Sequence, residues 1–410
     1  MSVFSASTTL WESVVGGFCI GFSALVLLHG AGEVLGFSSL LGTVCITHPK
    51  RALTCTNYGF KVAFLASFLL TCQLLVHTSS GSSGLLSQYG GIFDEYAVAP
   101  LWIVAISGIL AGYGTKLANG CTSGHGISGI GRMSIRSFVA VLTFMTTGFL
   151  SASLLGAWPN AARLADGSTT SFFSPAAYGV GIALTVILCF ALVVNIVNVR
   201  KVHSEKSQSQ QKVSAIDATT STANDDGEDK ADIEAQFDDD NNDVCEDEAC
   251  DNTPSMSSYY LKVLAAILAA PIFAFGLAFG GMTKPSKLLG FFDLSGFARG
   301  EYDPSLLFLF AAGCAVSFVA YQFVADRGLA FLQGHLPVRT KAFNGEEYHL
   351  PTNKQITAKL VVGSALFGIS IGISGFCPSP SLIMGVGGYL DAMFVWLPLF
   401  IVGRFIPEFL

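Results

Sequence analysis

Two short polar segments, each with one cysteine, interrupt apolar stretches of the chain. Residues 119–131 read NGCTSGHGISGIG, and residues 374–388 read SGFCPSPSLIMGVGG. In each segment, glycine or proline breaks the preceding apolar helix, and small polar residues follow. A short helix beginning near Thr122 and another beginning near Pro378 would direct free N–H groups and positive dipole ends at one point. The two segments therefore predict an anion-binding site.

The two cysteines give this predicted site its specific chemistry. A thiol is a weak, soft hydrogen-bond donor, so it suits a polarizable sulfur atom better than a hard oxyanion oxygen. The alternative is that each cysteine is only a small apolar packing residue; we favour that alternative for Cys72, Cys189 and Cys314. The predicted substrate-binding residues are Cys121, Cys377, Thr122, Ser123, Gly124, His125, Ser379 and Ser381, with Cys19, Lys116 and Lys287 as further candidates.

Some of these residues have a second interpretation. His125 is either a proton relay or a loop histidine that caps backbone groups, and we favour the cap. Lys116 ends an apolar segment, where a lysine ordinarily extends to the membrane interface. Lys287 lies in a basic stretch that would attract an anion if it folds back into the membrane. For Cys19, which lies among glycines in the first apolar block, both a packing role and a substrate role stay open.

The segments lie in a chain that is built from apolar blocks. Hydrophobic residues make up 51% of the 410 residues and charged residues 12%, which is about half the charged share of a soluble domain. Blocks of roughly 20 apolar residues have the length that a membrane-spanning helix needs. The expected spans are 11–31, 60–77, 98–117, 135–157, 176–199, 259–282, 305–325, 357–375 and 388–407. We therefore predict an all-α integral membrane protein with about nine transmembrane helices and short re-entrant helices.

An acidic segment divides the chain in two. Residues 200–257 hold 16 acidic and 5 basic residues, so they account for more than the whole formal charge of −7. They are poor in aromatic residues and cannot bury enough apolar area to fold alone. We predict an N-terminal transmembrane half (1–199), a disordered acidic cytoplasmic linker (200–257) and a C-terminal transmembrane half (258–410). No basic nucleic-acid surface is expected, because the remainder carries only a small positive charge.

The two halves contain a repeated pattern. Leu110–Cys121 reads LAGYGTKLANGC and Leu366–Cys377 reads LFGISIGISGFC, 256 residues later. Val34–Phe37 matches Leu288–Phe291 at a separation of 254 residues. The distribution of Lys and Arg places the N-terminus outside and the linker and C-terminus inside. Matched elements then cross the membrane in opposite directions, which is the inverted-repeat plan with a shared site near the midplane.

These motifs resemble those of the YeeE/YedE family of sulfur-compound transporters. The first half carries NGCTSGHGISG, and the second carries GMTKPSKLLGFFD at Gly281–Asp293 and GFCPSP at Gly375–Pro380. The resemblance covers nearly all of the chain outside 200–257. It implies uptake of thiosulfate or a related sulfur anion, passed between thiols that match Cys121 and Cys377. Ser379 stands where relatives often have glycine, which puts the identity of the substrate in question.

The predicted function is a membrane transporter, not an enzyme. It would import a small sulfur-containing anion, with membrane lipid around it and protons as one candidate coupling ion. We expect no cofactor, no metal and no nucleic acid, and a plasma-membrane location. A membrane sulfurtransferase or redox relay is the main alternative, but it needs a reactive low-pKa thiolate, and no Cys-x-x-Cys is present. An anion channel is a further alternative.

Overall fold

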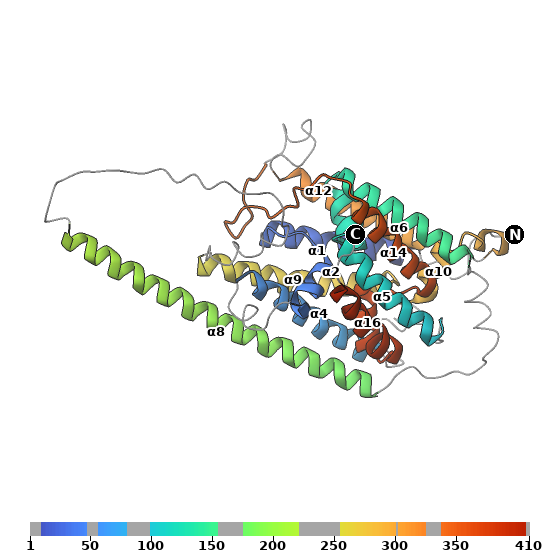
Figure 1. The fold of residues 1–410 in the computed structure, drawn as a ribbon, viewed down its shortest axis with the longest axis horizontal. Coiled ribbons are helices and arrows are strands. Elements are labelled where there is room, and N and C mark those ends of the chain that lie inside the picture. Colours follow the sequence, from blue (N-terminus) through green and yellow to red (C-terminus); the bar gives the residue numbers. More distant parts are fainter. Residues whose placement is uncertain are drawn as a thin grey trace.

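The computed structural model describes residues 10–46, 56–79, 99–154, 175–220, 255–300, 302–324 and 338–406. These residues form helices and isolated bridges but no strand. The helices are α1 (Leu10–Ala31), α2 (Phe37–Ile46), α4 (Thr56–Ser79), α5 (Leu101–Leu117), η2 (Thr122–Gly129), α6 (Ile135–Leu154), α8 (Pro175–Thr220), α9 (Met256–Phe279), α10 (Pro285–Phe292), α11 (Gly296–Arg299), α12 (Ser305–Gln322), α14 (Ala358–Ser374), α15 (Pro378–Val386), η5 (Asp391–Trp396) and α16 (Leu397–Phe405) (Figure 1).

The chain is a multi-pass, all-α integral membrane protein. Within the described ranges, seven helices are long and apolar enough to cross a membrane, and α14 and α15 together form one of them, Ala358–Val386. An eighth is α5 with η2, two helices that meet at an angle of 46°. The ninth predicted span, 388–407, consists of η5 and α16, and neither is long enough to cross by itself.

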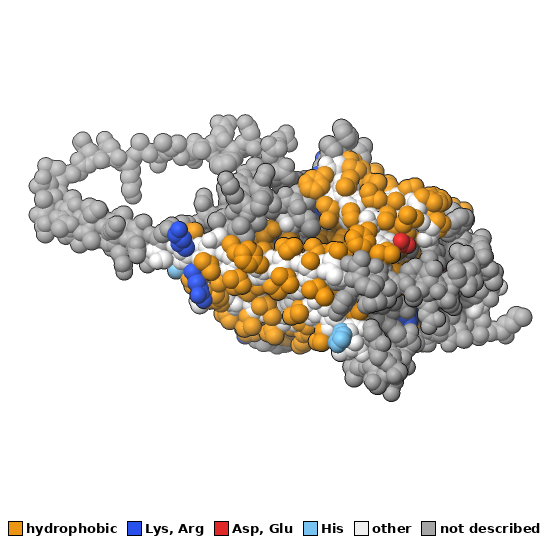
Figure 2. All heavy atoms as spheres, turned by 90° about the horizontal axis from the view of Figure 1, so that it is seen from below, with side chains coloured by type: hydrophobic (Ala, Val, Ile, Leu, Met, Phe, Trp, Pro, Cys, Tyr) orange, Lys and Arg blue, Asp and Glu red, His pale blue; other side chains and the backbone are white. Residues whose placement is uncertain are grey.

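The surface is that expected of a protein surrounded by lipid. Apolar side chains cover most of the described part of the face in Figure 2, and Lys and Arg side chains gather at one end. Helix α8 is the most exposed of the spanning helices, because only 17% of its apolar 18-residue stretch is buried. Its large exposed side chains are Ile182, Val186, Ile187, Phe190, Val193 and Val197. Exposure of this kind is stable in hydrocarbon but not in water.

Helix α8 also corrects the predicted start of the linker. It continues to Thr220, beyond the boundary that we placed at residue 199, and Figure 1 shows it extending past the other helices. Residues 200–220 contain neither glycine nor proline, so the helix that begins in the span has no local reason to end there. Residues 221–254 of the predicted linker lie outside the described residues, and α9 begins at Met256, inside the stretch that we assigned to the linker. The division into two halves stays a prediction.

The packing of the helices repeats between the two halves. Helix α1 packs against α9 and α12, and its counterpart α9 packs against α1 and α4. In the same way, α14 packs against α5 and α6, while α5 packs against α14 and α16. Each contact thus has a counterpart when α1 is matched with α9, α4 with α12, α5 with α14 and α6 with α16. This correspondence is expected of an internal pseudo-repeat.

Two glycine contacts repeat at the residue level. A Cβ atom built on Gly112 would lie 2.0 Å from the carbonyl oxygen of Phe400, and one on Gly368 would lie 2.2 Å from that of Phe144. Gly112 and Gly368 are separated by the same number of residues as Phe144 and Phe400. Small residues let membrane helices approach this closely, so the sequence repeat corresponds to a repeated helix contact.

Candidate functional site

The two cysteine segments meet in the structure. The side-chain oxygen of Thr122 lies 3.4 Å from the sulfur of Cys377, although the two residues are 255 positions apart. Cys121 directly precedes η2 and Cys377 directly precedes α15, each with extended backbone. Both thiols are 2% exposed. The two half-helices, η2 and α15, therefore begin at one buried place and at the residues that the sequence predicts.

Glycine is required where the chain turns into the second half-helix. Gly375 ends α14 with a φ of 70°, a left-handed conformation that favours glycine. A Cβ atom at this position would also lie 2.7 Å from the carbonyl oxygen of Pro285, at the start of α10. The turn from α14 therefore depends on Gly375, and it places Cys377 directly before α15.

The first turn of η2 is rich in donors. The start of a helix leaves its first amide groups without a partner in the helix. In η2, the amide of His125 donates to the carbonyl of Cys121. The Ser123 hydroxyl lies 3.2 Å from the sulfur of Cys121 and accepts a hydrogen bond from Phe37 N–H at 3.1 Å. A Cβ atom on Gly124 would meet only the Cα atom of Gly36, at 3.8 Å. The η2 end thus offers amides, hydroxyls and a thiol within one turn.

The first turn of α15 is built differently. Pro378 and Pro380 carry no N–H group, so Ser379 is the single amide donor among the first three residues of α15, and that amide lies near the Cys377 sulfur. Ser381 N–H bonds to the carbonyl of Cys377. The two half-helices are therefore not equivalent anion sites: η2 supplies most of the donors, and α15 supplies a dipole and one amide.

His125 spans three elements. Its Nε2 lies 3.0 Å from the carbonyl oxygen of Ala118, and its Nδ1 lies 3.2 Å from the Ser137 hydroxyl on α6. The side chain is 7% exposed, and a Cβ atom on Gly120 would lie 2.7 Å from the ring. Both ring nitrogens thus have protein partners, and this is the capping arrangement that we favoured from the sequence.

Two serines of the predicted set, Ser379 and Ser381, lie in the first turn of α15. The Ser381 hydroxyl is fully buried and has no hydrogen-bond partner among the described residues. An unsatisfied buried hydroxyl is costly, which makes Ser381 available to a ligand. Ser379 is 5% exposed, beside Cys377.

The remaining candidates lie apart from these contacts. Cys19 is half-buried on α1, where its Cβ atom packs against Gly276 of α9. Lys116 is in the last turn of α5, and the Lys287 ammonium lies over Gly281. None of these three takes part in the contacts described above between the cysteine segments. The thiol of Cys314, which we assigned to packing, donates to the carbonyl of Gly126 in η2 at 3.2 Å.

Sequence reasoning missed one element of the site. Residues 32–37, which lead from the end of α1 into the first residue of α2, contact η2 twice. The Ser128 hydroxyl donates to the carbonyl of Leu35 at 3.1 Å, and Phe37 N–H donates to Ser123. The repeated Val-Leu-Gly-Phe motif marked this region as duplicated, but it gave no sign that its backbone lines the cysteine site.

A multi-pass helical protein whose two broken helices begin at one buried place has the architecture of a membrane transporter. Residues 93–150 match the family model described as "Sulphur transport", and residues 261–410 match a family of unknown function (DUF6691). A "Probable transporter" of Xylella fastidiosa (strain 9a5c) is 32% identical over 152 residues, which are 36% of this chain and 96% of that protein. Another "Probable transporter", from strain Temecula1, is 37% identical over 133 residues, 32% of this chain and 80% of that protein.

The chain belongs to the YeeE/YedE family of sulfur-compound transporters. It is a membrane transporter, and membership implies a small anion as substrate. Each of the two relatives is covered over most of its length by about a third of this chain. Among the described residues, no group of three or more His, Cys, Asp or Glu is arranged to hold a metal ion.

Proposed function

We propose that this protein imports thiosulfate or a closely related sulfur-containing anion, and that the ion passes between Cys121 and Cys377. One observation carries the proposal: the Thr122 hydroxyl lies 3.4 Å from the Cys377 sulfur. This contact joins the starts of both half-helices at a single buried place. Because Cys121 directly precedes Thr122, both cysteines lie at this junction of the half-helices.

The donor set suits an ion with one terminal sulfur atom and three oxygens on the central sulfur. The thiols of Cys121 and Cys377 would contact the terminal sulfur through their S–H groups. The oxygens would accept from the first amides of η2 and from the hydroxyls of Ser123, Ser379 and Ser381. A hydrogen bond to a charged group contributes about 1.5–3 kcal/mol, so a few such donors offset the loss of water from the ion.

The buried cysteines require that elements move during transport. Both thiols are 2% exposed, so an ion reaches them only when the half-helices change position. Helix η2 is a π-helix, a form that is rare and concentrates at functional sites. We expect η2 and α15 to move, with the long spanning helices as the fixed frame. We also propose the plasma membrane as the location, the N-terminus outside, the linker and C-terminus in the cytoplasm, and either facilitated or proton-coupled flux.

The test is uptake of radiolabelled thiosulfate into proteoliposomes that contain the purified full chain. Cys121→Ala and Cys377→Ala are compared with wild type, and Cys189→Ala is the matched control because Cys189 is exposed on α8. We expect both site variants to lose most uptake, the control to keep it, and sulfate to compete poorly with thiosulfate.

The outcomes separate the parts of the proposal. Full uptake by both site variants would remove the cysteine mechanism and leave a transporter. An absence of wild-type uptake at every imposed proton gradient would remove thiosulfate as the substrate. A persulfide on Cys121, seen by peptide mass spectrometry after incubation with thiosulfate, would favour the sulfurtransferase alternative.

A further inference from the structure

The segment of residues 338–351, here called the strap, is docked on the end of α1. It lies between α12 and α14 and contains no helix. Phe343 N–H donates to the carbonyl of His29 at 2.8 Å, and His349 N–H donates to the carbonyl of Gly32 at 2.8 Å. A Cβ atom on Gly32 would lie 3.1 Å from the carbonyl oxygen of Glu347. The strap thus follows the end of α1 and the start of residues 32–37, here called the connector.

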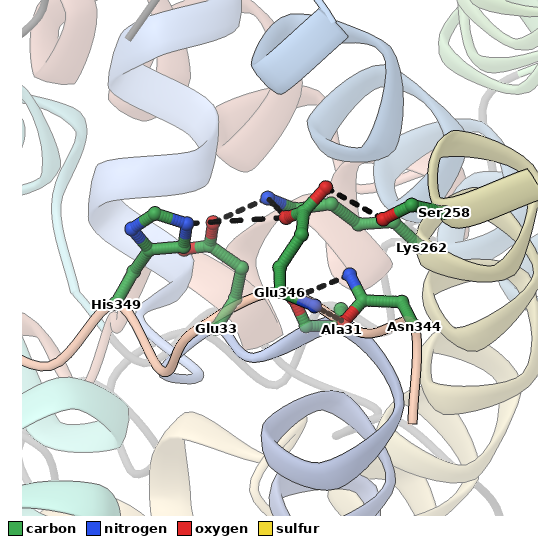
Figure 3. A network of polar contacts seen from close by, with 7 residues as sticks. All are labelled: Ala31, Glu33, Ser258, Lys262, Asn344, Glu346 and His349. Atoms are coloured by element: carbon green, nitrogen blue, oxygen red, sulfur yellow. Dashed lines mark hydrogen bonds and ion pairs between the residues drawn. The ribbon is translucent and has the colours of Figure 1, made fainter. Parts of the chain in front are cut away.

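Four charged side chains hold the strap in place, and we call them the latch: Glu33, Lys262, Glu346 and His349. The Lys262 ammonium lies 2.9 Å from Glu33 and 3.2 Å from Glu346, and the Ser258 hydroxyl donates to Glu346 at 2.7 Å (Figure 3). The Lys262 side chain is 2% exposed. Lys262 is on α9, Glu33 on the connector and Glu346 on the strap, so one buried ammonium joins three parts of the chain.

The connector continues from the latch to the cysteine site. At one end, Glu33 binds Lys262 and Gly32 binds the strap. At the other end, Leu35 accepts from Ser128 and Phe37 donates to Ser123, whose hydroxyl touches the sulfur of Cys121. Coupling between sites needs contiguous physical contacts, and here a few residues of backbone supply them.

The charge of the latch depends on His349. Glu33, Lys262 and Glu346 together carry one net negative charge, and a protonated His349 brings the total to zero. The imidazole Nε2 lies 3.9 Å from the Glu346 carboxylate, and His349 is about half exposed. The charged groups that face it are Glu346 on the strap, Glu33 on the connector and Lys262 on α9.

The two titrating groups of the strap favour the charged pair. Burial by itself would raise the pKa of Glu346, but the nearby His349, the charge of Lys262 and hydrogen bonds from Ser258 and Lys262 lower it to about 2. The nearby Glu346 carboxylate raises the pKa of His349, against the effect of burial. Because this pKa is raised on docking, the stabilisation is complete below the ordinary value of 6.5 and is lost as the pH rises through the docked value.

We propose that the latch is a pH-sensitive device that docks the strap on the connector and thereby positions Ser123 beside Cys121. Lys262 and Glu346 are then positioning residues of the cysteine site, although they do not touch it. Rising pH on the side that the strap faces loosens the strap and frees the connector. The last link, to transport, rests on the proposed function, whereas the docking of the strap can be measured without it.

Docking is measured by hydrogen–deuterium exchange of the purified full chain in nanodiscs, with peptides that cover 342–350 and rates corrected for intrinsic exchange. Between pH 5.5 and pH 8.5 we expect protection of the Phe343 and His349 amides to fall by roughly threefold, as for a half-exposed ion pair. Glu346→Gln should lower protection at pH 5.5 and remove its pH dependence. Glu347→Gln is the matched control, because this neighbouring carboxylate is exposed. Protection in wild type that does not change with pH would overturn the latch.

The link to the cysteine site is measured at one fixed pH, so that titration of the thiol itself does not enter. Cys121 is labelled with a small methanethiosulfonate, and the labelling rate is read from its own peptide by mass spectrometry. We expect Glu346→Gln to change this rate by roughly threefold or more and Glu347→Gln to leave it unchanged. Lys262→Arg should behave like wild type and Lys262→Met like Glu346→Gln.

The outcomes distinguish failure of the latch from failure of the proposed function. Loss of strap protection with an unchanged Cys121 rate would overturn the positioning of Ser123. Normal thiosulfate uptake with constant strap protection would reject the latch alone. A functioning latch in a protein without thiosulfate uptake would reject only the proposed substrate.

Discussion

The substitution Gly368→Ala tests the helix contact that sets the position of the second cysteine. A Cβ atom at this position would lie 2.1 Å from the Thr147 hydroxyl and 2.2 Å from the Phe144 carbonyl oxygen. Carbon–oxygen contacts between helices ordinarily reach about 3.3–3.6 Å. Helices α14 and α6 must therefore move apart by roughly 1 Å to accept the methyl group.

The cost follows from two opposing terms. Overpacking of a close contact destabilises by roughly 1–3 kcal/mol, and two atoms are overlapped here. Alanine in place of glycine returns about 1 kcal/mol through its helix propensity. At the upper end of the overpacking range we expect a net loss of about 2 kcal/mol, which lowers the melting temperature by roughly 2–3 °C in a protein of this size. Uptake should also fall, because α14 leads directly to Cys377.

The assay is thermal unfolding of the purified protein in detergent, followed by tryptophan fluorescence at one scan rate because such unfolding is often irreversible. Gly179→Ala is the control, since a Cβ atom on Gly179 of α8 would meet nothing within 4 Å. The control should melt at the wild-type temperature or slightly above it. Equal melting of Gly368→Ala and Gly179→Ala would refute the close approach of α14 and α6.

Four further predictions test the site, the repeat and the latch. Gly112→Ala, the pseudo-equivalent of Gly368→Ala, should lower the melting temperature similarly, since its Cβ atom would lie 2.0 Å from the Phe400 carbonyl oxygen. Thr122→Val keeps the shape but removes the hydroxyl on Cys377, so KM for thiosulfate uptake should rise roughly three- to tenfold with an unchanged melting temperature; an unchanged KM would contradict a shared site. Ser379→Gly removes one hydroxyl donor, and we expect weaker thiosulfate binding in a competition assay; tighter binding would show that the side chain obstructs the passage. The pKa of Glu346 lies at about 2 instead of the usual 4.5, so its stabilisation of the strap should be present above pH 4.5 and decline as the pH falls toward 2. The measurement is amide protection at Phe343 as a function of pH. The same decline in Glu346→Gln would mean that other groups cause it.

Local sequence features were sufficient to predict most of the helices. Apolar blocks of bilayer length marked the spans, because hydrocarbon requires every backbone group to be satisfied within the segment. Gly120 in the first segment, and Gly375 and Pro378 in the second, marked the breaks before the half-helices. The half-helices begin at Thr122 and Pro378, as predicted. The prediction failed at the end of α8, because the sequence after residue 199 is polar but does not break a helix.

The asymmetry of the two half-helices was also readable from the sequence, but only once their starting residues were known. Proline has no N–H group, so the donors of α15 depend on whether its first turn begins at Pro378 or a few residues later. The structure fixed that start and placed the Ser379 amide near the Cys377 sulfur.

By itself, the sequence determined that this is a helical membrane protein with two broken helices, each led by a cysteine, and it predicted that the two halves are related. Those properties depend on hydropathy and on backbone-breaking residues, which act within a few turns of one helix. Only the tertiary structure decided that Thr122 meets Cys377, that Ser123 is held by Phe37, and that the strap is docked through Lys262. Such contacts join residues far apart in the chain, so they depend on how whole helices pack and leave no periodic pattern in the sequence.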